Sequence, residues 1–292
     1  MGNAMQPSTS MSEALELWLA RRAASGKIST ASFRPYRQHF RAATNFLGDV
    51  PICDVTPEMT ARYQLHLNAT LSPRTTYTRI GVLMDFFRDM VRLDVLEADP
   101  TRALERKAPP KTLPRPAPPH VAASLMAGSS PRTALMVALG AHVGLRRFEI
   151  AKVRRSDFNL AERQLNVYNG KGGKDAVLPI SEDVVRLLGE YVEAVGIAPN
   201  GWLFPSDRRP GEHLSPGQVG RAITEASHRI GEHVTPHRYR HQAGTEMTKH
   251  AGIKAAQTLL RHSSSATTDI YSAFDTQDLQ RQVDSLHRPD AA

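Results

Sequence analysis

Hydrophobic side chains in the first hundred residues recur at helical spacing. Within residues 12–24, Leu15, Trp18 and Leu19 stand at positions i, i+3 and i+4, which places them on one face of a helix. Residues 33–47 repeat the pattern with aromatic side chains. Both segments therefore predict amphipathic helices that bury one face.

Two pairs of a hydroxyl residue and a proline mark the starts of two further helices. Thr56 precedes Pro57 and Ser72 precedes Pro73, and Ser or Thr caps helices that have proline at their first position. The helix from Pro73 has a broad apolar face, formed by Tyr77, Ile80, Leu83, Met84, Phe87 and Val91. The pattern predicts a small N-terminal domain of four helices, residues 11–98.

The second half of the chain mixes helices with short strands. Ser130 and the proline after it precede the run ALMVALGAHV, which is apolar on every side and predicts a buried helix capped by Ser130. Gly144 suits the end of that helix. Residues 164–168 and 175–179 flank the glycine-rich tip 170–174, which is typical of a β-hairpin. Further helices are expected over residues 181–195, 215–230 and 235–250.

A proline-rich segment separates the two halves. Residues 109–119 contain six of the 20 prolines, and proline removes backbone donors and blocks helix continuation. We expect residues 99–119 to form an extended, semi-rigid linker between parts of 98 and 173 residues. The expected fold class is mainly α with a small β-hairpin or sheet.

The length of 292 residues fits two domains. The hydrophobic content of 40% suffices for packed cores, and no apolar run approaches the roughly 18 residues of a membrane span. Residues 1–10 lack the apolar segment of a signal peptide, and Gln6 breaks the myristoylation pattern. Cys53 is the only cysteine, which excludes an internal disulfide and a cysteine-based metal centre. These features indicate a soluble, cytoplasmic protein.

The net charge of +8 is unevenly distributed. Residues 99–119 carry five basic and two acidic side chains, residues 120–274 have a net charge of +5, and residues 275–292 have a net charge of −2. Arginine outnumbers lysine 29 to 8; its planar fork suits phosphate, although a GC-rich genome also favours arginine codons. The balance makes nucleic acid a candidate partner.

Two motifs follow the predicted buried helix, and each has two readings. Arg146 is rooted at the end of that helix and needs a partner charge, which Glu149 supplies one turn later; alone, the pair indicates a structural ion pair. The tip GKGGK contains Lys171 and Lys174. Its glycines would let backbone approach a phosphate, but it lacks the P-loop pattern and alone predicts a hairpin tip with solvated lysines.

A third motif has three polar residues on one helix face. His237, Arg240 and His241 lie at i, i+3 and i+4 near a predicted helix N-terminus, a geometry that suits an anion. The spacing of His237 and His241 also allows a metal, but HExxH is absent and Arg240 would repel a cation. We therefore expect no metal site. His262 and Tyr271, taken alone, indicate a surface residue and a half-buried aromatic.

The order of these motifs is more informative than any one of them. The segments GLRRFEI, GKGGKDAVLPI, TPHRYRH and LLRHSSSATTDIY, with 25 residues from Arg146 to Lys171, 22 from Arg240 to His262 and nine from His262 to Tyr271, strongly resemble the tyrosine recombinase (phage integrase) family. The chain is most similar to an Xer-like two-domain member. Small departures are Phe148, Tyr239 and Arg261, the last in place of a usual glycine.

The resemblance implies a domain organisation. Residues 11–98 would be a helical, SAM-like core-binding domain that binds DNA, and residues 120–274 an α+β catalytic domain. Residues 99–119 would be the basic linker between them. The tail, 275–292, would take part in a helix that docks either on a neighbouring subunit or on its own domain.

The resemblance also implies a reaction. DNA would be cleaved through a covalent 3′-phosphotyrosine bond and then rejoined to another strand. Tyr271 would be the nucleophile, and Arg146 and Arg240 would bind the non-bridging phosphate oxygens. Lys171 would protonate the leaving 5′-oxygen, and His237 would transfer a proton. His262 would donate a hydrogen bond to the phosphate, and Glu149 would orient the arginines. Lys174 competes with Lys171 for its role and is otherwise a DNA contact, as are Lys107, Lys111 and Arg115. No metal, ATP or other cofactor is implied, because the arginines stabilise the charge and the phosphotyrosine bond stores the energy.

The implied partner is double-stranded DNA, enclosed by the two domains in a C-shaped clamp. A homotetramer would act on two recombination sites, and the free protein would be a monomer or dimer. Accessory DNA-bending proteins would be further partners. No membrane would be involved, and the protein would be located in the cytoplasm at the nucleoid. The about ten residues before the first helix favour a simple Xer-type, plasmid or transposon enzyme over a large phage integrase with an arm-binding domain. The alternatives are a type IB topoisomerase-like DNA relaxase and a catalytically inactive DNA-binding relative.

Overall fold

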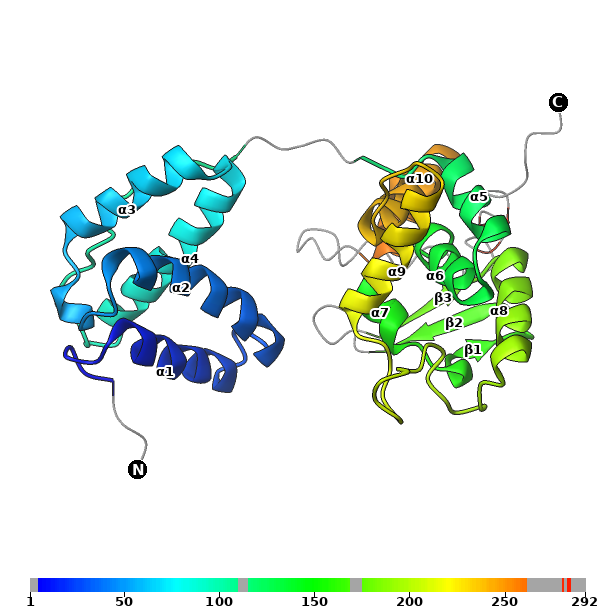
Figure 1. Cartoon of the computed structure of the whole chain (residues 1–292), viewed down its shortest axis with the longest axis horizontal. Helices are drawn as coiled ribbons and strands as arrows, with labels where there is room; N and C mark the ends of the chain where they lie inside the picture. The colour runs from blue at the N-terminus through cyan, green and yellow to red at the C-terminus, as the bar shows by residue number, and fades with distance from the viewer. Residues whose placement is uncertain (1–4, 110–114, 169–174, 262–279, 281–282, 285–292) are drawn as a thin grey trace. The chain divides into compact units, whose positions relative to one another are not determined.

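The computed structural model of the chain describes residues 5–109, 115–168 and 175–261, together with Gln280, Val283 and Asp284. The chain forms two units, Met1–Thr112 and Leu113–Ala292 (Figure 1). Their boundary lies inside the proline-rich segment. The finer division of the chain at residues 98, 119 and 274 stays a prediction.

The described residues of unit 1 form four α-helices, as the hydrophobic pattern predicts. They are α1 (Met11–Ala24), α2 (Phe33–Leu47), α3 (Pro57–Thr70) and α4 (Pro73–Arg92), with short 3-10 turns at Thr30–Ser32 and Ile52–Asp54. The side chain of Thr56 accepts a hydrogen bond from the amide of Met59, and that of Ser72 accepts one from the amide of Thr75. Both predicted caps are therefore confirmed.

Aromatic rings from three helices fill the core of unit 1. Trp18 and Phe40 pack edge-on against Phe86, with ring centroids 5.6 Å and 4.7 Å away. The buried indole nitrogen of Trp18 donates a hydrogen bond of 2.8 Å to Asp89, which also forms an ion pair with Arg22. The carboxylate of Asp89 thus provides the hydrogen-bond acceptor that the buried N–H group of Trp18 needs.

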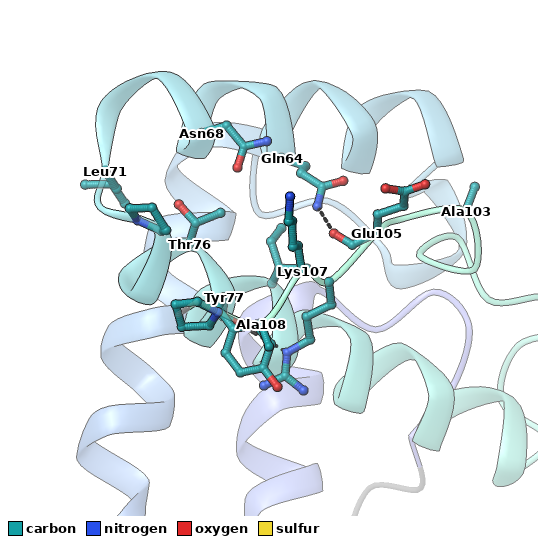
Figure 2. A pocket seen from close by; sticks show the side chains of 13 residues that line it. Gln64, Asn68, Leu71, Thr76, Tyr77, Ala103, Glu105, Lys107 and Ala108 are labelled. Carbon is teal, nitrogen blue, oxygen red and sulfur yellow. Dashed lines mark hydrogen bonds between the residues drawn. The ribbon is translucent and has the colours of Figure 1, made fainter. Parts of the chain in front are cut away.

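The first half of the expected linker is anchored on unit 1. Leu104 is buried in the core of that unit, and the amide nitrogen of Gln64 donates to the carbonyl oxygen of Glu105 (Figure 2). The guanidinium of Arg106 lies 3.9 Å from the centroid of the Tyr77 ring. Together with α3 and α4, this strap (residues 103–109) lines a pocket of about 730 Å³ (Figure 2). These residues are therefore held against the domain by their side chains, and the role of residues 99–119 as an extended, semi-rigid linker stays a prediction.

Unit 2 is built around one buried helix. It contains α5 (Pro119–Gly128), α6 (Pro131–Ala141), α7 (Arg147–Lys152), α8 (Glu182–Val195), α9 (Pro216–Arg229) and α10 (Pro236–Leu260). Every residue of α6 from Ala134 to Ala141 is buried, and Figure 1 shows α6 between α5, α8, α9 and α10. The prediction of a buried helix is confirmed. Its predicted side-chain cap is wrong, since the hydroxyl of Ser130 bonds to that of Thr133 instead.

A small antiparallel sheet lies in the same unit. Its strands are β1 (Phe158–Asn159), β2 (Gln164–Val167) and β3 (Ala176–Pro179), in the order β1-β2-β3. Leu165 pairs with Leu178, and both are buried. The pairing of β2 and β3 confirms the predicted hairpin, whereas β1, with two residues, is too short for a periodicity to be recognised.

Helix α10 contains a break and ends at the residue that departs from the usual motif. Gly252 has φ 83° and ψ 171°, which divides the helix close to the predicted end at His250. The second helical stretch ends at Arg261, whose φ of 50° lies in the left-handed region. That conformation is common at helix ends and favours glycine.

Three residues of the C-terminal tail are described, and they pack on unit 2. Val283 is buried in a cluster with Ala243 and Met247, Gln280 donates to the carbonyl oxygen of Ile180, and Asp284 forms an ion pair with Arg163. The other residues of the predicted 273–286 helix lie outside the described part, so docking on a neighbouring subunit stays a prediction. Among the described residues, no helix is long and apolar enough to cross a membrane.

Candidate active site

The turn between α6 and α7 positions the first candidate residues. Gly144 adopts φ 69° there, and Arg146 precedes the first residue of α7 in an extended conformation. The backbone amide of Arg146 donates 2.7 Å to Oε2 of Glu149, and its Nη1 lies 3.0 Å from Oε1. Glu149 is buried. The predicted pair of Arg146 and Glu149 is therefore present, and it fixes the start of the helix as well as the guanidinium.

Arg240 lies in the second turn of α10, with its side chain buried. Its Nη1 donates to the carbonyl oxygen of Gly144 and its Nη2 to that of Leu260. Burial, followed by the charges of Arg146 and Arg261, lowers the pKa of Arg240 to about 9, which Glu149 partly opposes. The guanidinium is still protonated at neutral pH and lies beside a second arginine.

Arg261 contributes a third guanidinium to the same cluster. Its Nη2 lies 2.8 Å from Oε2 of Glu149, so one carboxylate binds two arginines. Burial is the main cause that lowers the pKa of Arg261, while Glu149 raises it. Arg146, Arg240, Arg261 and Glu149, called here the arginine cluster, have a net charge of +2.

Two histidines extend from the first turns of α10. Nε2 of His237 lies 2.9 Å from Nε2 of His241, with ring centroids 4.2 Å apart. Burial, then Arg240 and Arg146, lowers the pKa of His237. Burial, then His237 and Arg240, lowers the pKa of His241. Both rings are therefore neutral at pH 7 and can accept a proton.

The structure brings together only part of the expected site. Arg146, Glu149 and Arg240 lie together in the arginine cluster. His237 lies close enough that the charges of Arg240 and Arg146 help to lower its pKa, after burial. Lys171, Lys174, His262, Tyr271 and Lys111 lie outside the described residues.

The other two residues expected to contact DNA come from the linker. Lys107 is exposed and lines the pocket of unit 1 (Figure 2). Arg115 is exposed too, and its carbonyl oxygen accepts a hydrogen bond from Nε of Arg238. Their roles in DNA binding stay predictions.

Two residues of the site had no assigned role on sequence grounds. Arg261 was visible only as a departure from the usual glycine, and His241 only as a neighbour of His237 on one helix face. The contact between Arg261 and Glu149 spans 112 positions, so no local pattern could reveal it. Within the described part of the chain, no group of three or more His, Cys, Asp or Glu side chains could hold a metal.

Comparison with known proteins identifies the family of this chain. The model of the phage integrase family matches residues 119–278. The tyrosine recombinase XerC of Shewanella amazonensis is 26% identical over 274 residues, which are 89% of this chain and 91% of that protein. The tyrosine recombinase XerA of Pyrococcus furiosus is 34% identical over 155 residues, about half of each chain (52% and 54%).

Solved structures share the fold. A lambda integrase (75–356) dimer bound to a COC′ core site has a TM-score of 0.71 at 20% identity, covering 91% of this chain and 99% of that one. The integrase of mycobacterium phage Brujita has a TM-score of 0.51 at 28% identity, covering 93% and 91%. The chain therefore belongs to the phage integrase family and is a tyrosine recombinase of the Xer type, a site-specific DNA recombinase.

Proposed function

We propose that this enzyme cleaves and rejoins duplex DNA through a covalent bond between Tyr271 and a 3′-phosphate. The observation that carries the proposal is the arginine cluster, in which Arg146 and Arg261 bind one buried carboxylate and the buried Arg240 lies close to them. A cluster with a net charge of +2 suits an anion, and the fork of arginine matches the geometry of phosphate oxygens.

In the cleavage step, the phenolic oxygen of Tyr271 attacks the phosphorus atom while its proton passes to His237. The bond between phosphorus and the 5′-oxygen breaks, and Lys171 supplies the proton that this oxygen takes up. Arg146 and Arg240 hold the non-bridging oxygens, whose charge grows in the pentacoordinate state. His262 donates a further hydrogen bond, and rejoining reverses the steps with the 5′-hydroxyl of another strand.

The lowered pKa of His237 suits this role. A histidine that is neutral at pH 7 can take the phenolic proton, whereas an imidazolium could not. Tyrosine has an ordinary pKa near 10, so it becomes a strong nucleophile only as its proton leaves. Burial is the main cause of the lowered pKa of His237, and the two arginines that add to it, Arg240 and Arg146, are those that would bind the phosphate.

The DNA partner and the assembly follow from the relatives. A lambda integrase has been solved as a dimer on a core site and as a tetramer on a Holliday junction, and we infer a homotetramer on two sites for this chain. The core-binding region 11–98, the linker and the catalytic region 120–274 would enclose the duplex, with Lys107, Lys111, Lys174 and Arg115 on phosphates. We infer that an enzyme acting on DNA in this way works in the cytoplasm, at the nucleoid.

A nicked DNA substrate that carries the recognition site, selected from a random pool, tests the proposal. The wild-type chain should form a covalent complex that resists boiling in detergent, and Tyr271→Phe should form none while it still binds the site. Cleavage by Tyr271→Phe would show that the nucleophile is another residue. Relaxation of supercoiled DNA without a site would favour the topoisomerase-like alternative, and site binding by a wild-type chain that never cleaves would favour the inactive relative.

A substrate with sulfur in place of the bridging 5′-oxygen identifies the proton donor. A thiolate leaves without a proton, so a variant that lacks the general acid regains its rate on this substrate. We expect such rescue for Lys171→Ala and none for Lys174→Ala. Rescue of Lys174→Ala instead would exchange the roles of the two lysines.

A further inference from the structure

Arg261 and Arg146 both form ion pairs with the carboxylate of Glu149. Oε1 of Glu149 lies 3.0 Å from Nη1 of Arg146. Oε2 accepts from the backbone amide of Arg146 at 2.7 Å and from Nη2 of Arg261 at 2.8 Å. Glu149 is almost entirely buried, and the side chain of Arg261 is only 15% exposed. The contact is therefore a sheltered one, in which charges act strongly on each other.

Without Arg261, the carboxylate would neutralise Arg146. A buried Arg–Glu pair has no net charge, and Arg240 alone would supply the positive charge of the cluster. With Arg261 present, Glu149 is held by two cations, and the cluster gains one positive charge. A phosphodiester carries one negative charge, and its pentacoordinate state carries two. The net charge of the complete cluster, +2, equals the charge of that state.

Two donors of Arg261 are unpaired in the described part of the chain. Nε and Nη1 are buried and have no hydrogen-bond partner among the described residues. Buried donors rarely remain unpaired in a working protein. The backbone at this position, with φ 50°, would be equally served by glycine, so helix termination alone does not call for an arginine.

We propose that Arg261 is a positioning residue for the strand-cleavage reaction. It binds Glu149, keeps Arg146 available for the phosphate, and adds a third positive charge beside the developing negative one. The proposal rests on the function proposed above. It assigns a role to a residue that in similar recombinases is usually glycine.

Cleavage kinetics with Arg261→Gly and Arg261→Lys test the proposal. Glycine suits the left-handed backbone, so this variant should keep its fold, and thermal melting measures the cost of losing the buried ion pair. Its single-turnover cleavage of the nicked substrate should fall roughly 10-fold or more, as for other residues that orient a site, while site affinity in a Tyr271→Phe background stays the same. Lysine should restore part of the rate. Arg186→Gln, at an exposed arginine paired with Asp183 and Glu190, is the control and should cleave like the wild type.

A double variant separates a role through Glu149 from a purely structural one. If Arg261 acts through Glu149, then Arg261→Gly should slow the Glu149→Gln enzyme far less than it slows the wild type. Wild-type cleavage by Arg261→Gly, or the same loss of rate in both backgrounds, would overturn the proposal.

Binding of orthovanadate, an oxyanion, gives a readout that needs no cleavage. The shift in melting temperature on adding orthovanadate should be smaller for Arg261→Gly than for the wild type. If the wild type forms no covalent complex at all, the proposed function fails. The vanadate-dependent melting shifts of the wild type and Arg261→Gly then decide by themselves whether Arg261 helps to bind an anion. Equal vanadate binding by the two proteins would then overturn it.

Discussion

The guanidinium of Arg240 donates a hydrogen bond to the carbonyl oxygen of Gly144, 96 positions earlier in the chain. A second bond from the same group reaches the carbonyl oxygen of Leu260. One side chain thus ties the turn before α7 to the end of α10. A residue expected to bind phosphate is also a structural tie between the segments that carry Arg146 and Arg261.

Substitution of Arg240 should therefore reduce both activity and stability. Arg240→Ala removes a phosphate donor, which typically costs about 10²–10³ in rate, and leaves two buried carbonyl oxygens without their donor. Arg240→Lys should be almost as slow, since an ammonium cannot reach both carbonyl groups in the geometry of a planar fork. Single-turnover cleavage and thermal melting measure the two effects. Arg221→Ala, at an exposed arginine of α9, should melt like the wild type.

A rate loss for Arg240→Ala with unchanged melting would mean that its bonds to Gly144 and Leu260 contribute no stability. Unchanged cleavage would mean that Arg240 does not bind the phosphate.

The cleavage rate should resist mild acid. Burial and the neighbouring arginines lower the pKa of His237 below its ordinary value of 6.5, so the ring stays neutral, and able to accept a proton, to a lower pH. The rate–pH profile should therefore lose activity only below about pH 6.5. Single-turnover rates between about pH 5 and 8 test this, and an acidic decline that begins above the ordinary histidine pKa would contradict it.

The same shift predicts the direction of the stability change. The unfolded chain binds protons at His237 and His241 more readily than the folded one, because burial lowers both folded pKa values. Their effect on stability is therefore fully favourable above the unfolded pKa and is lost as the pH falls toward the folded values. Urea unfolding at several pH values should show that the free energy of unfolding of the wild type falls more steeply with falling pH than that of a His237→Gln, His241→Gln double variant. If the free energies of unfolding of the two proteins changed with pH in the same way, the lowered pKa values of His237 and His241 would be contradicted.

Two aspartates of α4 offer a matched pair for the stability of unit 1. Asp89 accepts the buried indole hydrogen of Trp18 and pairs with Arg22, whereas Asp85 forms an exposed pair with Arg88. Asp89→Ala should cost about 1–3 kcal/mol in the free energy of unfolding, because a buried donor loses its acceptor. Asp85→Ala should cost less than about 1 kcal/mol. Chemical denaturation measures both, and equal losses would mean that the Trp18 bond is energetically unimportant.

Gly81 on α4 makes room for the strap of unit 1. A Cβ atom at this position would lie 2.3 Å from Nη2 of Arg106, so Gly81→Ala should displace Arg106 from the Tyr77 ring. Trypsin should then cut after Arg106 or Lys107 faster than in the wild type, as mass spectrometry can show. Gly189→Ala on α8, where a Cβ atom would meet nothing within 4 Å, is the control and should only gain helix propensity, about 1 kcal/mol. Unchanged trypsin cleavage in Gly81→Ala would show that Arg106 does not hold the strap.

Local patterns predict most of the helices and the hairpin, but not α5, α7 or the part of α10 after Gly252. Apolar spacing, the pairs Thr56-Pro57 and Ser72-Pro73, and the apolar run after Ser130 each depend on residues a few positions apart. Propensity and capping act at that range. The order of Arg146, His237 and Arg240 likewise identified the family, because a motif is a property of the chain itself.

Contacts between distant segments decided the rest. The order of residues along the chain is enough to predict most of the helices, the division into two parts and the side chains that are candidates for chemistry. Packing is what brings Arg261 to the Glu149 that Arg146 also binds, buries Arg240 against Gly144 and holds Arg106 over the Tyr77 ring. The contacts of Arg261 with Glu149, of Arg240 with Gly144 and of Arg106 with Tyr77 each join residues tens of positions apart, and their energies depend on burial, which no local pattern specifies.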